Sequence, residues 1–335
     1  MAQMPEQMPG ILAKIDDPWG ISWRVVNCLK RLSLRRTCRF LASYIRGVGY
    51  ERPVFIIGVP RSGTTLLFYL LRASDELGAL PREGHDLWRT YHHPRYTGWR
   101  SDALGKGAVR FGERRFVNAY LYAHAVTTRR FVEKTPENSL RVPYLLELFP
   151  DAFFVVVKRN PGDVIHSLIQ GWRHPSGRFR SYYLSQDLHI PGYPHQRRWC
   201  FALIEGWQNY VAAPIPQIAF AQWQQCTQAL IAARGLVPPA QWLEVHFEQL
   251  LASPDETFAR LCQGIGIENT PTLRKKLAAL LAEPVNALSA PGINKWRREY
   301  AHEIEDFFPQ IATLAMDAGY LVDPATGDFA ISPYD

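Results

Sequence analysis

Cysteine is scarce in this sequence, which has five in 335 residues: Cys28, Cys38, Cys200, Cys226 and Cys262. Their number is odd, they are scattered along the chain, and no two of them form a Cys-x-x-Cys motif. This argues against a disulfide framework and against a cysteine-based zinc site. It favours a reducing compartment, so we expect a cytoplasmic protein.

Long apolar runs are also lacking. No uncharged stretch approaches the roughly 20 residues that a membrane-spanning helix needs, and no signal-peptide core is present. The chain has neither an internal repeat nor a low-complexity linker. What it does have is 47% apolar and 21% charged residues, which is typical of a globular protein with a large core. Its net charge of +7 suits an anionic cofactor, substrate or surface.

The amino-terminal segment is strongly basic. Residues 19–46 have a helical pattern, and their basic side chains are Arg24, Lys30, Arg31, Arg35, Arg36, Arg39 and Arg46. One interpretation is an interfacial helix on an anionic membrane. The other, which we favour, is a basic helix packed on the protein. We therefore expect residues 1–50 to form a basic helical extension whose contact with membranes is at most peripheral.

The most informative stretch is the one from position 53 to position 71. An apolar run of strand length, Val54–Ile57, is followed by a loop bracketed by Gly58 and Gly63 and then by a helical pattern from Thr64 to Leu71. Strand, glycine-bracketed loop and helix form the arrangement that holds phosphate groups. The loop and first-turn N–H groups converge on one point, where the helix dipole favours an anion.

The glycine spacing of this loop matches a Walker A motif, but the lysine of that motif is missing. Thr64 and Thr65 stand where Lys and Ser/Thr should follow the second glycine, and a basic residue, Arg61, lies inside the loop instead. A kinase or ATPase without that lysine is disfavoured. Arg61, Ser62, Gly63, Thr64 and Thr65 still predict an anion site.

Further strands and helices complete an α/β pattern. We expect strands at 77–81, 131–134, 152–157 and 242–247, and helices from Pro136 to Phe149, at about 201–233, and at 253–264 behind a capping box that Ser253 and Glu256 form. The continuous apolar run at 152–157 is typical of a central strand covered on both faces. These features predict a three-layer fold with a central, mostly parallel sheet and helices on both of its faces.

A second strand-to-helix junction follows the run at 152–157. Arg159 stands at the carboxyl end of that strand, Asn160 suits an N-cap, Pro161 suits the first helical position, and capping also explains Asp163. Open parallel sheets bind ligands at the carboxyl ends of their strands. This junction is therefore a second candidate for anion binding.

Four segments, taken in order, resemble sulfotransferases that use 3'-phosphoadenosine 5'-phosphosulfate (PAPS). They are Pro60–Thr65, Arg159–Ser167, Glu244–Leu250 and Gly292–Arg297. The resemblance covers roughly residues 52–320. It is nearer to the tyrosylprotein, glycan and bacterial types than to the cytosolic phenol type, because Arg61 replaces the lysine of cytosolic members.

The resemblance implies where the cofactor lies. Residues 61–65 would surround the 5'-phosphosulfate, and Arg159 and Ser167 would hold the 3'-phosphate. Lys295, Trp296 and Arg297 would close over the cofactor from a late loop. The desulfated product is PAP. No metal should be required, because a sulfuryl group bears less charge than a phosphoryl group in an otherwise similar transfer.

Three residues are candidates for catalysis. Glu83 stands where glutamate-using members keep a catalytic carboxylate, and it should take the proton of the acceptor hydroxyl. His85 is the second candidate for the base, because imidazole titrates nearer neutrality. We expect Asp86 to cap the helix that follows. Lys134 should stabilise charge on the bridging oxygen as the phosphate departs.

Residues 51–335 are thus expected to form a single sulfotransferase domain, with insertions at about 86–128 and 172–200 that build the acceptor pocket. The acceptor would be a hydroxyl of a small molecule, natural product, glycan or lipid. Nucleic acid is not expected as a partner. Two alternatives are a P-loop nucleotide or small-molecule kinase, and a noncatalytic P-loop protein that binds nucleotide.

Overall fold

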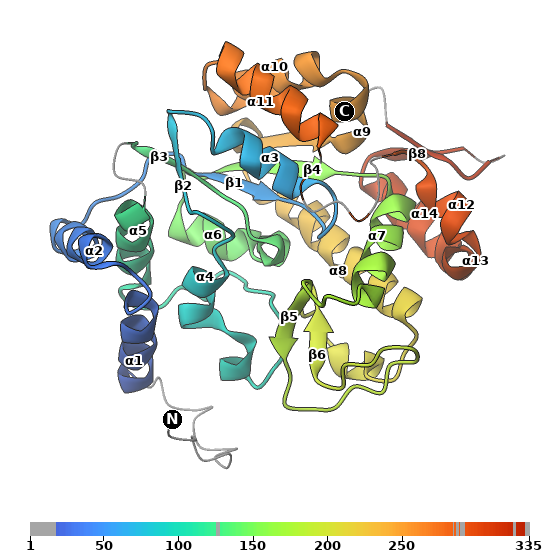
Figure 1. Ribbon diagram of the computed structural model, residues 1–335, viewed down its shortest axis with the longest axis horizontal. Coiled ribbons are helices and arrows are strands. Elements are labelled where there is room, and N and C mark those ends of the chain that lie inside the picture. The colour runs from blue at the N-terminus through green and yellow to red at the C-terminus, as the bar shows by residue number, and fades with distance from the viewer. Residues whose placement is uncertain are drawn as a thin grey trace.

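A five-stranded parallel sheet forms the centre of the protein. Our computed structural model describes residues 18–124, 128–283, 285, 288, 292–323 and 326–331, with side chains from residue 24 onward. The strand order is β2-β3-β1-β4-β7, and all four pairings are parallel (Figure 1). The strands are β1 (Val54–Ile57), β2 (Leu77–Ala79), β3 (Arg130–Glu133), β4 (Phe153–Lys158) and β7 (Trp242–His246).

Alternate side chains of the central strands enter two separate hydrophobic clusters. Phe153, Val155 and Val157 of β4 pack on one face of the sheet, and Phe154 and Val156 pack on the other. Successive side chains of a strand point to opposite faces, so a strand covered on both faces must be apolar throughout. The continuous apolar run of β4 is thereby explained, and the predicted fold class is confirmed.

Helices cover both faces of the sheet (Figure 1). One face is covered by α3 (Thr64–Leu71), α9 (Phe247–Ala252), α10 (Pro254–Ile265) and α11 (Pro271–Ala282). The other is covered by α4 (His85–His92), α5 (Glu113–His124), α6 (Val142–Leu148), α7 (Pro161–Arg173), α8 (Ile215–Arg234) and α14 (Phe308–Asp317).

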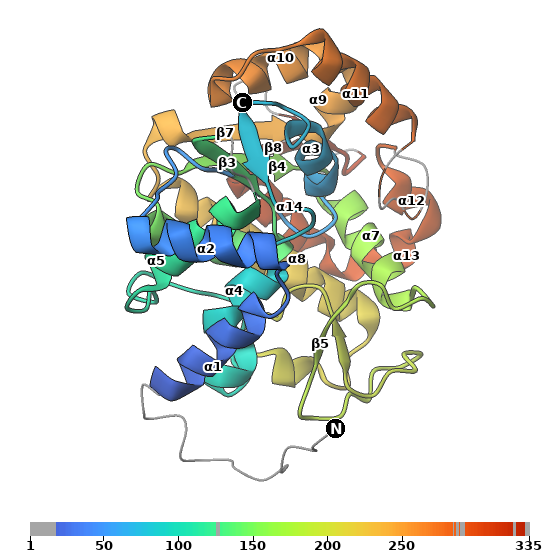
Figure 2. The ribbon, with the colours of Figure 1, turned by 60° about the vertical axis from the view of Figure 1, so that its left-hand side comes forward.

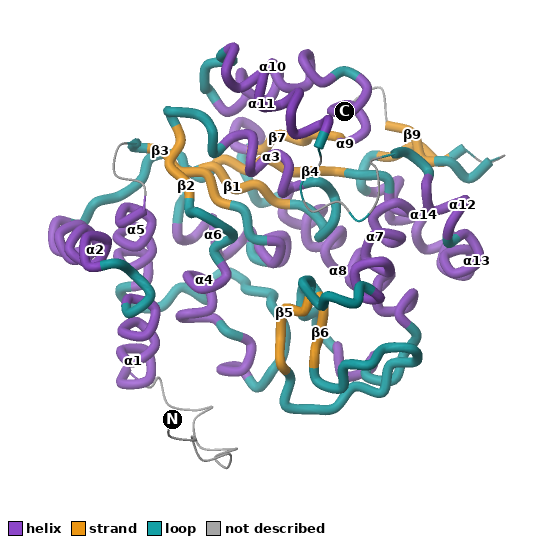
Figure 3. The backbone as a smooth tube through the Cα atoms, in the orientation of Figure 1, coloured by secondary structure: helices purple, strands orange, loops and turns teal. Residues whose placement is uncertain are grey.

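Smaller elements lie outside these layers. An antiparallel hairpin of β5 (Arg180–Tyr183) and β6 (Arg198–Cys200) lies apart from the central sheet (Figure 3). Short helices and a second hairpin follow late in the chain: α12 (Lys295–Glu299), α13 (Ala301–Ile304), β8 (Tyr320–Val322) and β9 (Phe329–Ile331). The 3₁₀ turns are Pro94–Thr97, Pro136–Leu140, Trp207–Tyr210, Pro239–Gln241 and Glu305–Phe307.

The expected single helix at 19–46 is in fact two helices, α1 (Pro18–Leu29) and α2 (Leu34–Arg46). Ser33 separates them in an extended conformation, with φ −66° and ψ 157°. Ser33 occupies the position before α2, but its side chain makes no capping hydrogen bond. The break allows α1 to contact α4 while α2 contacts α5 (Figure 2). No helix in the described part of the chain is long and apolar enough to cross a membrane.

Three local predictions are wrong. The helix expected from about 201 begins only at Ile215, because the preceding segment is held by other contacts, among them a 2.7 Å hydrogen bond from the Leu203 amide to Asp102. Ser253 precedes α10, but its side chain makes no capping hydrogen bond. Asp86 lies in the first turn of α4 behind the N-cap Gly84, and its carboxylate pairs with Arg31 and Arg82 instead of capping the helix.

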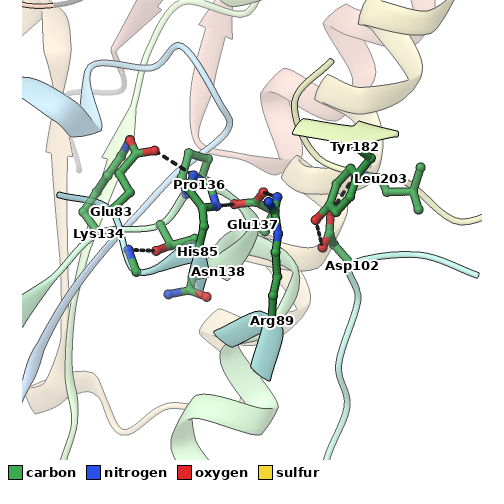
Figure 4. A network of polar contacts seen from close by, with 12 residues as sticks. Glu83, His85, Arg89, Asp102, Lys134, Pro136, Glu137, Asn138, Tyr182 and Leu203 are labelled. Carbon is green, nitrogen blue, oxygen red and sulfur yellow. Dashed lines mark hydrogen bonds and ion pairs between the residues drawn. The ribbon is translucent and has the colours of Figure 1, made fainter. Parts of the chain in front are cut away.

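The two segments predicted as insertions touch each other. Asp102, in the first segment, accepts hydrogen bonds from the Tyr182 hydroxyl in the second segment and from the Leu203 amide (Figure 4). Arg141 pairs with the same carboxylate, and all of these side chains are buried. The two segments are therefore joined at this buried carboxylate, and residues 125–127 of the first segment lie outside the described residues.

Candidate active site

The loop between β1 and α3 has an unusual backbone. Arg61 has φ +79° and Gly63 has φ +104°, and both values lie in the left-handed region. For arginine this conformation costs about 1–3 kcal/mol and persists only where the surroundings enforce it. A Cβ added at Gly63 would lie 2.5 Å from the ring of Phe247 on α9. The fold thus holds the loop tightly, with glycine required where Phe247 approaches.

The junction between β4 and α7 is equally well fixed. The Asn160 side chain accepts a hydrogen bond from the Asp163 amide at 3.3 Å, so the predicted N-cap is confirmed, as is Pro161 in the first turn. The Asn160 amide in turn donates to Glu248 Oε1 at 2.7 Å. The segment Glu244–Leu250 therefore braces both loops, one through Phe247 and the other through Glu248.

The two loops meet because β1 and β4 are neighbours in the sheet. Arg61 Nε donates to Ser167 Oγ of α7 at 3.2 Å, and Arg159 Nη1 donates to the Arg61 carbonyl at 3.2 Å. The Arg159 guanidinium lies over the ring of Phe247, 4.8 Å from its centroid. Arg159 Nε is buried and has no hydrogen-bond partner among the described residues. It is a strong donor placed where an anion could bind.

A cavity of about 370 Å³ opens where these loops meet. The predicted site residues on its wall are Arg61, Gly63, Thr64, Thr65, Glu83, His85, Lys134, Arg159, Ser167 and Lys295. Ser62, Trp296 and Arg297 are not among the residues that line it. The ring of Trp296 packs on Gly162, and Arg297 Nε pairs with Asp328 at 2.7 Å.

The wall of this cavity is strongly cationic. Among the described lining residues, seven are arginine or lysine and three carry a carboxylate. Burial, with the charges of Arg159 and Arg178, lowers the pKa of Arg61 to about 10. Gathering guanidinium groups in this way is unfavourable unless an anion compensates them. The cavity therefore fits a cofactor with separate phosphate groups, which arginine binds well.

The three candidate catalytic residues lie together (Figure 4), and all three line the cavity. Lys134 Nζ contacts Glu83 Oε1 and lies 3.1 Å from Thr65 Oγ1, next to the anion loop. His85 Nε2 lies 2.9 Å from Glu83 Oε2. Burial alone would raise the pKa of Glu83, but Lys134 and His85 outweigh it and lower this pKa to about 2.

Sequence reasoning missed two residues of this cluster, Glu137 and Arg89. Glu137 is buried, with Oε1 3.1 Å from Arg89 Nη2 and Oε2 3.3 Å from His85 Nδ1. Burial opposes a charge on His85, but Glu137 and Glu83 raise the pKa of His85 to about 9. The only signal in the sequence was that Glu137 comes three residues after Lys134.

The β5–β6 hairpin and the late loop complete the wall. Arg178, Phe179, Arg180 and Ser181 line the cavity, and the Arg61 guanidinium lies over Phe179, 4.7 Å from its centroid. From the described part of the first insertion, Arg89 of α4 lines the cavity.

Asp163 has a role beyond the capping that we expected of it. Its Oδ1 accepts a hydrogen bond from the Trp296 amide at 3.2 Å. Asn160 Nδ2 donates to Asn294 Oδ1 at 2.7 Å. The second loop thus fastens the late segment, which brings Lys295 to the cavity.

These features define a P-loop-like α/β protein that binds a phosphorylated ligand. The sheet is parallel, a loop of the phosphate-binding type follows β1, a cationic loop follows the neighbouring strand, and the Walker lysine is missing. A sequence model of the family described as "Sulfotransferase family" matches residues 53–218 and 193–271. The chain belongs to the sulfotransferase family. Membership of this family confirms the predicted family, the enzyme class and the cofactor PAPS.

Individual relatives are distant. A putative protein-tyrosine sulfotransferase of Caenorhabditis briggsae is 22% identical over 65% of this chain and 67% of its own length. The nodulation protein NoeE of Sinorhizobium fredii is 29% identical over 64% of this chain and 50% of its own. The chain thus spans about half the length of NoeE. The crystal structure of sulfotransferase STF9 from Mycobacterium avium superposes with a TM-score of 0.54 at 15% identity, covering 89% of this chain and 88% of STF9.

Proposed function

We propose that this protein transfers a sulfuryl group from PAPS to a hydroxyl group of an acceptor. The observation that carries the proposal is the cationic cavity at the meeting point of the loops after β1 and β4, with the paired side chains of Glu83 and Lys134 on its wall. Family membership supports the same reaction. The hydroxyl could belong to a small molecule, natural product, glycan or lipid.

We assign the cofactor contacts according to the cavity wall. Arg61, Gly63, Thr64 and Thr65 would surround the 5'-phosphosulfate, with Ser62 supporting the loop from behind. Arg159, Ser167 and Lys295 would hold the 3'-phosphate, an assignment supported by the unsatisfied Nε of Arg159. Trp296 and Arg297 would act indirectly, because they shape the late segment through Gly162 and Asp328.

The catalytic roles follow from the positions of Lys134 and Glu83. PAPS supplies an activated sulfuryl group whose departure leaves charge on a phosphate oxygen. Lys134 Nζ, 3.1 Å from Thr65 Oγ1, is placed to stabilise that charge. An anion beside Lys134 also competes with Glu83 for the ammonium group. Glu83 then becomes a stronger base for the acceptor proton.

A peripheral contact with anionic membranes is a second, independent prediction. On α2 the apolar side chains of Leu34, Leu41 and Ile45 are 81%, 50% and 75% exposed. Their spacing places them on one helical face, beside Arg35 and Arg46. This supports interfacial binding. We keep the cytoplasm as the predicted compartment, which the five free cysteines support.

Two measurements test the proposed reaction. Calorimetry should detect binding of PAP without magnesium, and a screen of hydroxyl acceptors with sulfur-labelled PAPS should detect transfer. Magnesium-dependent binding of ATP, with no binding of PAP, would favour the kinase alternative. PAP binding without turnover on any acceptor would favour the noncatalytic alternative.

A further inference from the structure

The side chain of His85 lies between two carboxylates that come from different parts of the fold. Its Nε2 lies 2.9 Å from Glu83 Oε2, in the loop before α4. Its Nδ1 lies 3.3 Å from Glu137 Oε2, in the 3₁₀ turn that follows β3 (Figure 4). Each nitrogen of the ring therefore faces a carboxylate oxygen. Such a chain of Glu137, His85 and Glu83 links a buried group to the proposed base.

Glu137 is well suited to control the ring. Its side chain is 2% exposed, whereas those of His85 and Glu83 are 30% and 29% exposed, and all three residues line the cavity. The other oxygen of Glu137 is held by Arg89, 3.1 Å away. A buried carboxylate fixed by two cationic partners keeps a single position, and it favours the charged form of each partner.

A third carboxylate, that of Glu133, also lies near His85. Glu133 is buried, and its carboxylate accepts hydrogen bonds from the Gly84 amide, Thr135 and Asn138. Burial raises the pKa of Glu133. Arg89 opposes the charge on His85, while Glu137 and Glu83 favour it, and the pKa of His85 is raised to about 9. At neutral pH the ring is thus an imidazolium, which carries an N–H at each nitrogen: Nε2–H is hydrogen-bonded to Glu83, and Nδ1 is ion-paired with Glu137.

We propose that Glu137 is a positioning residue of the transfer reaction, which acts through His85 on the carboxylate of Glu83. This inference rests on the proposed function. With Nδ1 turned toward Glu137, Nε2–H binds Glu83 Oε2. The remaining oxygen, Oε1, faces Lys134 and becomes available when the ammonium turns to the departing phosphate. Oε1 is then the atom that takes the proton of the acceptor hydroxyl.

The proposal predicts the direction in which the pH dependence of activity should shift. Glu137→Gln keeps the shape of the side chain but removes the negative charge beside His85, so the pKa of His85 should fall from about 9 toward its ordinary value of 6.5. If the imidazolium orients Glu83, activity should then decline at a lower pH than in the wild type. If neutral His85 were the base itself, the same substitution would instead raise activity near neutrality.

A second buried Glu–His pair offers a matched control. Glu113 Oε1 lies 2.8 Å from His92 Nε2, and both side chains are buried. Neither residue is on the wall of the cavity. Glu113→Gln therefore repeats the chemical change and the burial of Glu137→Gln at a distance from the reaction.

The experiment compares the full-length wild type, Glu137→Gln and Glu113→Gln. The pKa of His85 is measured by NMR titration, and kcat and the affinity for PAP are measured across the pH range. We expect Glu137→Gln to lower the His85 pKa, to move the alkaline limb of kcat toward neutrality and to lower kcat at pH 8 by roughly 10- to 100-fold, the scale on which a misplaced catalytic group is felt. PAP affinity should stay unchanged, and Glu137→Asp should restore part of kcat. Glu113→Gln should leave the profile as in the wild type.

Two results would overturn the inference: an unchanged His85 pKa in Glu137→Gln, or a gain of activity near neutral pH. The NMR titration requires no turnover. If no acceptor is sulfated, the proposed function fails, and the titration still decides whether Glu137 controls the charge of His85.

Discussion

Replacement of Arg159 tests the assignment of the 3'-phosphate site. Arg159 combines three features: a guanidinium stacked on Phe247, one hydrogen bond to the Arg61 carbonyl, and a buried Nε without a partner among the described residues. The guanidinium donors that these contacts do not use, Nε among them, are left for a ligand. Arg159→Ala removes all three, so the loss of the ligand contact must be separated from the loss of packing.

AMP provides that separation, because it lacks the 3'-phosphate of PAP. A change in packing around Arg159 should weaken both ligands similarly, whereas loss of the phosphate contact weakens PAP alone. A charge-assisted hydrogen bond contributes about 1.5–3 kcal/mol, and each 1.4 kcal/mol is about tenfold in affinity. We therefore expect the preference for PAP over AMP to fall by about 10- to 100-fold in Arg159→Ala.

Calorimetry with PAP and with AMP measures this ratio directly. Arg173, the last residue of the helix α7 that follows Arg159, is a suitable control, because its guanidinium pairs with Glu303 and it does not line the cavity. Arg173→Ala should leave the ratio unchanged. The assignment is refuted if the wild type binds the two nucleotides equally, or if Arg159→Ala weakens both by the same factor.

Three further outcomes are expected. Gly63→Ala should weaken PAP and lower the free energy of unfolding in denaturant by about 1–3 kcal/mol, because the new Cβ meets Phe247; unchanged affinity and stability would contradict this. Glu83→Gln should lower kcat by roughly 10²-fold or more, while the affinity for PAP stays unchanged. In the wild type the pKa of Glu83 is lowered to about 2, so its carboxylate stays charged from neutrality down to that pH. The wild-type profile of kcat/KM should therefore show no acid limb near pH 4.5. Wild-type protein should sediment with anionic vesicles at low salt more than with neutral ones, and Leu41→Ser/Ile45→Ser should abolish the difference; equal sedimentation of wild type with both would exclude the membrane contact.

The sequence predicted those parts of the site that depend on short segments. The bounds of β1 and α3 are as expected, because an apolar strand, a glycine-bracketed loop and an apolar helix are encoded within about 20 residues. The N-cap at Asn160 is equally local. The break at Ser33 and the late start of α8 were missed, because contacts from elsewhere in the fold decide them.

The supporting contacts could not be predicted in the same way. Phe247 and Gly63 are in contact but are 184 positions apart in the sequence, and Glu137 and His85 are 52 positions apart. Neither pair therefore forms a recognisable motif or periodic pattern in the sequence. Both pairs exist because parallel strands bring their carboxyl ends to one edge of the sheet. A motif therefore identifies the groups that can touch the cofactor, while the order of the strands decides which buried groups hold them in place.

The same supporting contacts decide between the two candidates for the catalytic base. From the sequence, Glu83 and His85 are competing candidates, because each could accept a proton. In the fold they are joined, since His85 Nε2 faces Glu83 and Glu137 faces the opposite nitrogen. A ring held between two carboxylates is stabilised in its charged form, and an imidazolium has no lone pair with which to accept a proton. The geometry therefore favours Glu83 as the base and His85 as the group that orients it.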